Sequence, residues 1–442
     1  MLHSKIPSHF KARRDALVQG HPGGVFLFPS NPDYVRNSDV HYPYRQDSHF
    51  FYLTGFEEAE SFLVLAPKKA GAGSYRMILF VLPRDPEKEM WEGERYGIEG
   101  AQQVFGADEV YPISELEQRL PGLMDAGDRV FYRMGHPQGG DQRVLVAMEK
   151  HRRALGRTGR ALLPIEDSSG PVGELRLFKG PDEIETMREV CRVTAQAHRT
   201  VMQELRPKMI ESEIEALIDY QFRKGGCQRL GYGSIVAGGK NAACLHYRAN
   251  NEALRDGDLV LIDAGGEMDY YSADITRTFP IGHRFTSGQA KAYDLVLKAQ
   301  KVGIVATRPG ATLPEIHKQV CEVMIDGLFS LGLAEGSKEE LFKNCGFRRF
   351  FPHGTSHWLG MDVHDVGLYL KDGQPRPLEP GMVFTVEPGF YVQPHDSKVP
   401  EEFRHLGIRI EDDILVTAQG CENLTQDAPK ERSELEALRE RF

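Results

Sequence analysis

The sequence lacks any long apolar run. No window approaches the roughly 18 apolar residues that a membrane-spanning helix needs. The first residues, MLHSKIPSHFKARRDALV, contain no continuous apolar core of the kind that a signal peptide requires. Low-complexity sequence is missing too, except for the charged tail KERSELEALRERF, which predicts a terminal surface helix. We therefore expect no membrane partner.

Cysteine pairs of the CxxC type are also missing. The six cysteines are scattered along the chain, at Cys191, Cys227, Cys244, Cys321, Cys345 and Cys421. This scatter is typical of reduced thiols, and it argues against a disulfide framework and against a cysteine zinc site. Together with the missing signal peptide, it predicts a cytoplasmic protein.

Basic residues are not in excess. Lys and Arg number 54 against 64 Asp and Glu, which gives a formal net charge of −10. A surface that follows nucleic-acid phosphates needs a basic excess, so we expect no nucleic-acid partner. The 442 residues, 40% of them hydrophobic, are enough to bury more than one core, which predicts two domains.

The first part of the chain alternates apolar runs with helix-like stretches. The runs GGVFLF, SFLVLAP and RMILFVLP read as strands, and SELEQRLPGLMDA reads as a helix. This alternation predicts an α/β domain over residues 1–172. The following stretch, LLPIEDSSGPVGELRLFKGPDE, is rich in Pro, Gly and Ser, and it predicts a linker or domain boundary.

The second part, residues 173–442, has a different pattern. A helix is predicted from Pro181, because Asp182 and Glu183 lie in its first turn and apolar residues then recur at three- and four-residue spacing. Two more amphipathic helices are predicted at 211–226 and 287–307. The β-type runs DLVLIDAGG, GMVFTVEPGFYV and IRIEDDILVTA accompany them. Helices on one face of an antiparallel sheet make an α+β domain.

Acidic residues end strands that are otherwise apolar. LVLID ends in Asp263 and MVFTVE ends in Glu387, while strand alternation in GIRIEDD puts Arg409 and Glu411 on one face. Buried strand positions rarely carry a charge unless it is paired or bound to a metal. Any one of these acidic residues alone is more typical of a strand-end cap or a solvated group. A metal site is predicted only because several of them occur together.

Asp274 extends this set. It follows AGGEMDYYSA, whose two glycines suit a reversal between neighbouring strands, and such a hairpin would bring Asp274 close to Asp263. One of the three histidines in FFPHGTSHWLGMDVHDVG would complete a set of five oxygen and nitrogen ligands. The Gly-Thr-Ser between His353 and His357 makes a poor helix, so we do not expect a helical zinc-protease motif there.

Four carboxylates at one place require cations. Two divalent ions would supply about four positive charges, and a ligand set rich in oxygen favours Mn²⁺ over Co²⁺, Fe²⁺ or Zn²⁺. Two ions about 3.5–4 Å apart hold a bridging water, lower its pKa and clamp a tetrahedral intermediate. The predicted chemistry is hydrolysis.

These motifs, taken in order, resemble a known family. LVLIDAGGEMDYYSADITRTFP, PHGTSHWLGMDVHDVG, TVEPGFYV and GIRIEDDILVT are similar to the catalytic domain of aminopeptidase P, the Xaa-Pro aminopeptidases of the pita-bread metallopeptidases. HYPYRQDSHFFYLTGFEEAESFLVL resembles the start of the bacterial members. The resemblance covers nearly the whole chain. It implies a pita-bread fold for residues 173–442, and relatives with this long N-terminal domain commonly form homodimers or homotetramers.

The resemblance also implies roles for individual residues. The metal ligands would be Asp263, Asp274, His357, Glu387 and Glu411. Asp274 and Glu411 would bridge the ions, Asp263 would bind one ion, and His357 with Glu387 would bind the other. His364 would lie near the scissile carbonyl, His353 would line a proline pocket, and His246 would be a hydrogen-bond partner or proton shuttle.

Four further residues are weaker candidates. Arg409, two residues from Glu411, would hold the ligand carboxylates in place, and Tyr391 would hydrogen-bond that network. Trp91 resembles a tryptophan that reaches a neighbouring subunit's site, although an exposed loop aromatic reads the same way. Tyr232 in LGYGSIV is a candidate substrate-binding residue.

The resemblance implies a mechanism and a specificity. A hydroxide between two ions would attack the carbonyl before a proline in second position, with Glu387 as general base and His364 stabilising the oxyanion. Proline has no amide N–H, so a pocket along His353 would select its ring by shape. The free amine of the substrate would approach the ion held by Asp263, which restricts cleavage to the N-terminus.

Three rival functions stay open at this point. A prolidase cleaves Xaa-Pro dipeptides with the same ligands, but it must bind a proline carboxylate. A metal-free pita-bread module would bind peptides or histones, and a creatinase-like amidinohydrolase also works without metal. The complete ligand set disfavours the last two.

Overall fold

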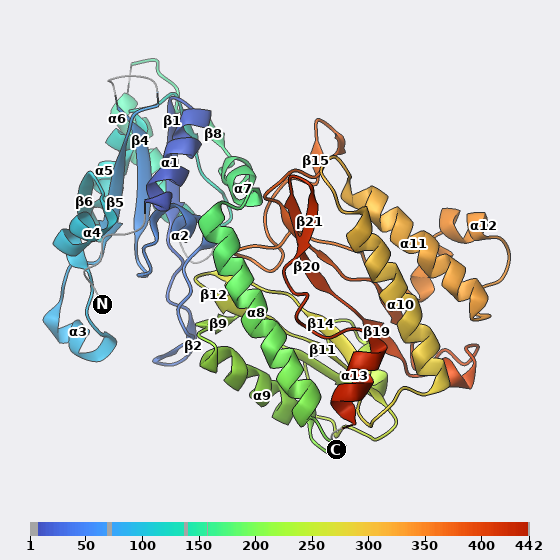
Figure 1. Cartoon of the computed structure of the whole chain (residues 1–442). Coiled ribbons are helices and arrows are strands. Elements are labelled where there is room, and N and C mark those ends of the chain that lie inside the picture. The colour runs from blue at the N-terminus through green and yellow to red at the C-terminus, as the bar shows by residue number, and fades with distance from the viewer. Residues whose placement is uncertain (1–7, 69–72, 137–139, 157, 441–442) are drawn as a thin grey trace. The chain divides into compact units, whose positions relative to one another are not determined.

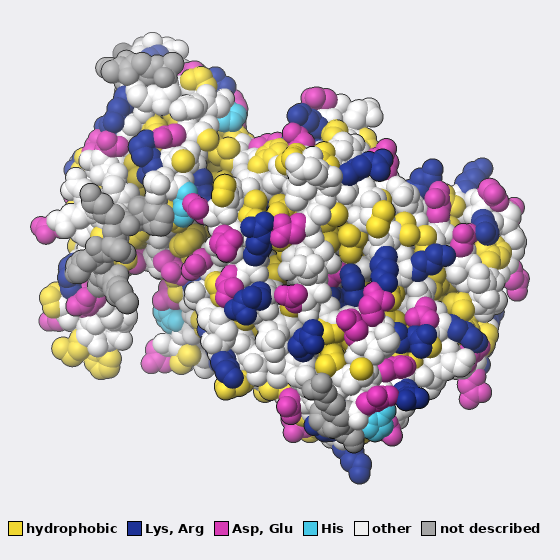
Figure 2. Space-filling view, in the orientation of Figure 1, with side chains coloured by type: hydrophobic (Ala, Val, Ile, Leu, Met, Phe, Trp, Pro, Cys, Tyr) yellow, Lys and Arg dark blue, Asp and Glu magenta, His cyan; other side chains and the backbone are white. Residues whose placement is uncertain are grey.

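The structure is a computed structural model that describes residues 8–68, 73–136, 140–156 and 158–440 (Figure 1). It divides into two compact units, Met1–Leu175 and Arg176–Phe442. None of the helices in the described ranges is both apolar enough and long enough to cross a lipid bilayer. On the face seen in Figure 2, Lys and Arg are interspersed with Asp and Glu rather than gathered in one basic patch.

Unit 1 is built on one six-stranded sheet. Its strands have the order β6-β5-β4-β1-β7-β8, and their bounds are β1 Gly24–Pro29, β4 Phe62–Pro67, β5 Tyr75–Val81, β6 Glu109–Pro112, β7 Arg129–Phe131 and β8 Ile165–Glu166. The β1–β4 and β4–β5 pairs are antiparallel, and the other pairs are parallel. The predicted apolar runs form the three central antiparallel strands, because side chains on both of their faces are buried.

Helices and a small ribbon complete unit 1. They are α1 His9–Gly20, β2 Val35–Asn37, β3 Val40–His41, α2 Ser48–Thr54, α3 Pro86–Glu92, α4 Gly97–Phe105, η1 Ile113–Glu115, α5 Leu116–Met124, α6 Gly140–Leu155 and most of α7 Ser169–Leu177, whose last two residues belong to unit 2. Leu116 and Leu120 of α5 and Val144 of α6 pack against Val64 and Ile78 of the sheet. The α/β class predicted for the N-terminal domain is confirmed.

Unit 2 combines long helices with short antiparallel sheets. The helices are α8 Pro181–Glu204, α9 Glu211–Lys224, α10 Ser287–Ala306, α11 Leu313–Ser330, α12 Lys338–Lys343 and α13 Arg432–Arg439, with 3₁₀ turns η2 Gly239–Ala243, η3 Gly346–Arg349 and η4 Glu401–Phe403. Figure 1 shows α8, α10 and α11 lying alongside the strands of the unit. The predicted α+β pita-bread class is confirmed.

The strands of unit 2 form several small sheets. Their bounds are β9 Arg229–Leu230, β10 Ile235–Gly238, β11 Leu259–Asp263, β12 Gly266–Met268, β13 Tyr271–Ser272, β14 Thr276–Pro280, β15 Leu370–Lys371, β16 Gln374–Pro375, β17 Val383–Val386, β18 Gly389–Tyr391, β19 Gly407–Arg409, β20 Asp412–Thr417 and β21 Gly420–Asn423. The sheets β10-β11-β14 and β17-β20-β21 carry the acidic strand ends. Both are antiparallel throughout.

Local capping explains where the long helices begin. At the start of α8, the Glu183 carboxylate accepts a hydrogen bond from the Gly180 N–H, and Pro181 has the backbone angle that a first helical turn requires. At α10 and α11 the cap side chain accepts instead: the Thr286 and Thr312 hydroxyls accept from the backbone N–H of the third helical residue. The three predicted helices are therefore present. Helix α11 was not among them.

Two local expectations differ from the structure in detail. The stretch predicted as a linker or domain boundary does contain the division between the two units, but it is not an unstructured linker: it contains β8 and α7, and Val172 and Leu177 are fully buried. The reversal between Asp263 and Asp274 does not occur at the glycines. It occurs at Asp269 and Tyr270, which both have positive φ between β12 and β13.

The first of those two glycines, Gly265, instead lets two backbone segments pass close to each other. A Cβ atom at Gly265 would lie 1.8 Å from the carbonyl oxygen of Ala273. Only glycine lets the chain leaving β11 pass so near the segment before β14.

The tail helix α13 also differs from the predicted surface helix, since Leu435 and Arg439 are buried and Arg439 donates to the Met202 and Leu205 carbonyls of unit 2. The last two residues of that tail lie outside the described residues.

His198 of α8 makes the stability of unit 2 pH-dependent. Its ring is fully buried, and Nε2 bonds the carbonyl of Ala264 at 3.1 Å, while burial lowers the pKa to about 4 from the model-peptide value of 6.5. Between these two values the unfolded chain binds a proton that the folded chain excludes. Stability is therefore lost as the pH falls through this window, by up to about 3 kcal/mol.

We expect a His198→Gln variant to show a flatter loss of stability below pH 6.5. The Gln amide keeps a donor for Ala264 but does not titrate. Urea unfolding at pH 7.5, 6 and 5 measures the difference between variant and wild type. A difference that stays constant over the three pH values would contradict the assignment.

Candidate metal centre

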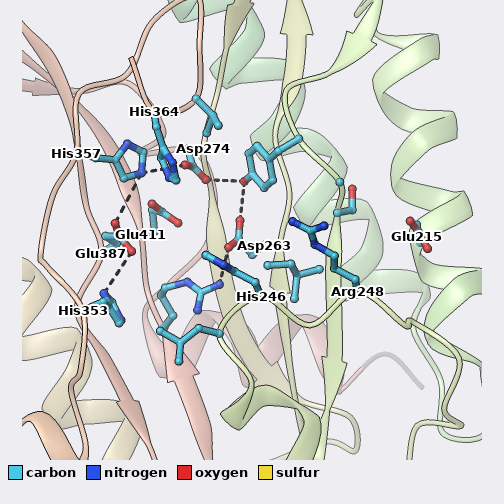
Figure 3. Close-up of a pocket in the computed structure, with 17 residues that line it drawn as sticks. Glu215, His246, Arg248, Asp263, Asp274, His353, His357, His364, Glu387 and Glu411 are labelled. Atoms are coloured by element: carbon cyan, nitrogen blue, oxygen red, sulfur yellow. Dashed lines mark hydrogen bonds and ion pairs between the residues drawn. The ribbon is translucent and has the colours of Figure 1, made fainter. Parts of the chain in front are cut away.

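The acidic strand ends and the histidines meet in one cavity of unit 2. The cavity has a volume of about 630 Å³, and its lining includes Asp263, Asp274, His357, Glu387 and Glu411, together with His246, His353 and His364 (Figure 3). All five predicted ligands and all three other predicted histidines therefore face the same space. Arg409 and Tyr232 line it as well.

Antiparallel pairing brings the carboxylates together. Asp263 is the last residue of β11 and pairs with Thr276 at the start of β14, two residues after Asp274. Glu411 lies just before β20, and its N–H donates to the Thr276 carbonyl at 3.1 Å. Glu387 follows β17, the strand that pairs with β20. Residues far apart in sequence are thus neighbours at the ends of four strands.

His357 is attached to β17 through its backbone. Its carbonyl accepts from the Thr385 N–H at 3.0 Å, and its N–H donates to the Thr385 hydroxyl at 3.2 Å. The segment around it is not helical, as expected from Gly354 to Ser356. The ring Nδ1 lies 3.0 Å from the Trp358 carbonyl, so Nδ1 carries the hydrogen and Nε2 faces the carboxylates.

Three side chains offer ligand atoms to a common point. Atoms of Asp274, His357 and Glu411 all lie within 4.8 Å of one another. The two other predicted ligands border this group. Nε2 of His357 is 3.7 Å from Glu387 Oε1, and Tyr232 joins Asp263 to Asp274 through its hydroxyl.

Burial and like charges make this acidic cluster unusual. Burial raises the pKa of Asp274 and of Glu411, and the neighbouring carboxylates raise both further. Burial also raises the pKa of Glu387, to about 7. For His357, burial alone would lower the pKa, but Asp274 at 3.4 Å and Glu387 reverse the direction and raise it to about 9. The site therefore favours added positive charge.

Arg409 neutralises only one member of the cluster. Its Nη2 donates to Asp263 Oδ2 at 2.5 Å, Nη1 to the Tyr391 hydroxyl at 3.0 Å, and Nε to the Thr276 hydroxyl at 3.0 Å. Tyr391 in turn lies 2.9 Å from His353 Nε2. The buried side chains of Arg409 and Tyr391 thus link Asp263 to His353 through hydrogen bonds.

The donor set fits divalent cations. Asp274 and Glu411 are nearly fully buried, and among the cavity-lining residues that the structure describes only Asp263 is paired with a buried arginine. Buried carboxylates without a counter-charge are strongly disfavoured unless a metal or a proton compensates them. Oxygen-rich ligands with one imidazole suit Mn²⁺, Co²⁺, Fe²⁺ or Zn²⁺.

A buried ion cluster holds the loop that carries His364. Asp365 accepts from Arg176 Nη2 at 2.5 Å and from Lys179 Nζ at 3.1 Å, and all three side chains are almost fully buried. His364 itself is exposed to the cavity, and its ring centroid is 4.4 Å from that of His357. The anchored aspartate thus fixes the position of the histidine before it.

Trp91 was predicted as a site residue but is not among the residues that line the cavity, and two charged residues that line it were not predicted. Trp91, on α3 of unit 1, is 87% exposed, and its predicted role stays a prediction. Sequence reasoning did not identify Arg248 or Glu215, which also line the cavity. Arg248 was detectable, since it lies two residues after His246 in the same segment. Glu215 lies on the amphipathic helix α9 and carried no such signal.

Comparison with known proteins places this geometry in a family. Residues 185–418 match the profile of Metallopeptidase family M24, and residues 10–132 match that of the Aminopeptidase P, N-terminal domain. The chain belongs to metallopeptidase family M24. It is therefore a metal-dependent hydrolase by family, as the strand-end carboxylates predicted.

Relatives of this M24 peptidase match it over its full length. It is 43% identical over 430 residues to the Xaa-Pro aminopeptidase of Escherichia coli strain K12, which covers 97% of each chain. The solved structure of Pseudomonas aeruginosa aminopeptidase PepP superposes with a TM-score of 0.94 at 43% identity and 99% coverage of both chains. A zinc-substituted Escherichia coli aminopeptidase P in complex with product matches equally, at 0.94 and 42% identity over 99% of each chain. The resemblance to aminopeptidase P predicted from the motifs is confirmed.

Proposed function

We propose that this M24 peptidase is an Xaa-Pro aminopeptidase, which releases the first residue from peptides that have proline in second position. One observation carries the proposal. The five oxygen and nitrogen donors that the motifs predict line one cavity, in a chain that matches the relatives named above from end to end. Peptides with a second-position proline are then the substrates.

The same donors support a site for two ions. Asp274 and Glu411 would bridge them, Asp263 would hold one, and His357 with Glu387 would hold the other. The closeness of Asp274, His357 and Glu411 supports this division. Mn²⁺ is the metal we propose, because four carboxylates and one imidazole form a predominantly hard ligand set.

Bound at this site, divalent ions would lower the pKa of a water molecule and polarise the scissile carbonyl. Side chains of the protein would transfer protons, stabilise the oxyanion and hold the ligands in position. Glu387 would accept the proton of the attacking water and return it to the leaving proline nitrogen. His364 would donate to the developing oxyanion, and His246 would hydrogen-bond the substrate or relay a proton. Arg409 would hold Asp263 in place, with Tyr391 and Tyr232 completing that network.

Selection of proline would depend on shape. His353 lines this end of the cavity, and the buried rings of Phe351 and Tyr391 pack edge-on against it, at 4.9 and 5.5 Å between ring centroids, which holds the imidazole as one wall. A pyrrolidine ring has no N–H to satisfy and fits such a wall. An N-terminal amine at the Asp263 side would then restrict cleavage to the first bond.

Some predictions go beyond this geometry. A cytoplasmic location, a homo-oligomer and a role of residues 1–172, including Trp91, in substrate access and oligomerisation remain part of the proposal. Residues 173–442 would form the catalytic domain. A prolidase uses the same ligands, so it is the main alternative. The metal-free peptide-binding module and the creatinase-like enzyme are disfavoured, because every carboxylate and the histidine of the ligand set are present.

A matched pair of peptides tests the proposal. Chelator-treated protein would be assayed with an Xaa-Pro-Yaa tripeptide and with its Xaa-Pro dipeptide, each with and without Mn²⁺. We expect fast release of the first residue from the tripeptide only when metal is present, and little release from an Xaa-Ala-Yaa control. Preference for the dipeptide would identify a prolidase. No turnover of either peptide by metal-loaded protein would refute a peptidase function.

A further inference from the structure

The cavity wall contains an arginine that no other described residue neutralises. Arg248 is exposed to the cavity, and within the part of the chain that the structure describes its guanidinium has no ion-pair or hydrogen-bond partner. It differs in this from Arg409, which is buried and bound to Asp263. An unpaired guanidinium in a substrate cavity is available to a ligand carboxylate.

The backbone around Arg248 is held on both sides. Before it, the Tyr247 hydroxyl donates to buried Glu211 at 2.8 Å. After it, the buried side chain of Asn250 donates to the Ser234 carbonyl at 2.8 Å and accepts from the Val236 N–H at 3.0 Å. The segment is therefore attached to the edge of β10.

The side chains next to Arg248 point in different directions. Tyr247 points to the Glu211 network, while His246 and Arg248, one residue to either side, line the cavity. The position of Arg248 is thus as well determined as that of His246, although its long side chain stays solvated.

Arg248 lies on the amine side of the proposed catalytic centre. Figure 3 shows Arg248 and Glu215 on the side of Asp263 that faces away from His357, Glu387 and His353. Ile235 of β10, which also lines the cavity, pairs directly with Asp263. If proline lies along His353 and the amine lies near Asp263, the side chain of the first residue extends toward Ile235 and Arg248.

We propose that Arg248 selects peptides whose first residue is Asp or Glu. This inference rests on the proposed Xaa-Pro aminopeptidase function and defines its first-residue preference. The guanidinium pairs with the side-chain carboxylate of that residue, and Ile235 and Leu245 contact its methylene groups. Glu215, on α9, lines the same wall without forming an ion pair with Arg248, and it repels acidic side chains that reach further.

The expected effect is moderate, because the pair is exposed to solvent. Exposed ion pairs change equilibrium or rate constants by roughly two- to fivefold. Salt weakens them, since the Debye length falls from about 10 Å at 0.1 M to about 3 Å at 1 M. The preference is therefore expected to shrink at high ionic strength.

Matched substrates test the role of Arg248. We expect kcat/KM of the Mn²⁺-loaded enzyme to be higher for Glu-Pro-Phe than for Gln-Pro-Phe, and Arg248→Gln to lower this ratio by roughly two- to fivefold. Arg248→Glu should reverse the preference and favour Lys-Pro-Phe over Met-Pro-Phe. Glu215→Gln should raise the Glu-to-Gln ratio. Arg308→Gln, which removes an exposed arginine that does not line this cavity, is the control.

A binding measurement separates this role from turnover. Analogues of Glu-Pro-Phe and Gln-Pro-Phe with a reduced first bond are not hydrolysed, and calorimetry should show the same preference in wild type and its loss in Arg248→Gln. A Glu-to-Gln ratio that Arg248→Gln leaves unchanged in both assays would overturn the role of Arg248 alone. Failure of the wild type to cleave or bind any Xaa-Pro peptide would overturn the proposed function as well.

Discussion

Replacing Glu411 with glutamine is expected to abolish turnover and, at the same time, to stabilise the metal-free protein. Glu411 is 2% exposed, and one of its oxygens accepts from the Thr276 hydroxyl at 2.6 Å. Burial and the neighbouring carboxylates Asp274 and Glu387 raise its pKa, which means that its charged form is disfavoured without a cation. A neutral amide of the same shape removes this repulsion.

The same change removes a proposed bridging ligand. Loss of outer-shell partners already lowers metal affinity by 10- to 100-fold, and we expect loss of Glu411 to exceed the upper end of that range, about 100-fold. Wild type at a metal concentration 100 times its Kd gains about 2.7 kcal/mol of stability per site. The variant should gain almost none at that concentration.

Two measurements check this prediction together. Thermal unfolding with chelator and with Mn²⁺ should give a higher Tm for the variant than for wild type without metal, and the reverse order with metal. Metal analysis after dialysis should show reduced content. Glu335→Gln, at an exposed position, is the matched control and should behave as wild type. A fully metal-loaded variant that retains turnover would refute the ligand assignment.

Replacing Arg277 with methionine is expected to cost about 3–5 kcal/mol of stability, the range found when one partner of a buried ion pair is removed. Arg277 and Asp412 are both fully buried, and Arg277 Nη2 donates to Asp412 Oδ1 at 2.6 Å. Lys430 also binds Asp412. Without the arginine, only Lys430 among the described residues neutralises the negative charge of Asp412, in a region that excludes water.

Arg277 also holds the backbone of the proposed metal centre. Its Nη1 donates to the Glu411 carbonyl at 2.5 Å and to the Thr276 carbonyl at 2.9 Å, while Nε donates to the Pro429 carbonyl at 3.1 Å. The methionine variant removes these three bonds, and of the acceptors the Thr276 carbonyl alone keeps another partner among the described residues, the Glu411 N–H. We therefore expect its metal affinity to fall together with its stability.

Urea unfolding of matched variants measures the effect. The double variant Arg277→Met with Asp412→Asn should lose less stability than the sum of the single variants, because the uncompensated charge is removed with its partner. Arg188→Met breaks an exposed ion pair with Glu422 and should change stability by no more than about 1 kcal/mol. Equal losses for Arg188→Met and Arg277→Met would contradict the argument.

Part of this molecule could be predicted from the sequence because the signals are local. A charge at the end of an apolar strand is visible in LVLID and MVFTVE without any knowledge of the fold, and the structure places Asp263, Glu387 and Glu411 in one cavity. Periodicity and first-turn residues located α8, α9 and α10 to within a few residues. These features depend on neighbours within a few positions along the chain.

Other features depend on contacts between distant segments. Gly265 is glycine because Ala273 passes close to it, and the reversal between Asp263 and Asp274 is displaced to Asp269 and Tyr270. The partner of Asp263 is Arg409, 146 residues further along the chain. No pattern of neighbouring residues predicts which of several carboxylates forms an ion pair with a given arginine.

By itself, then, the sequence determined the fold class, the family and the residues that carry the chemistry. The tertiary structure alone decided which of those residues are paired and which are free. Asp263 is bound to Arg409, Asp274 lies 3.4 Å from His357 with Glu411 close to both, and Arg248 remains open to the cavity. The physical reason is that charge and hydrophobicity are properties of single residues and their neighbours. Compensation of a buried charge depends on distances of about 3 Å, which only the packing of remote strands and loops sets.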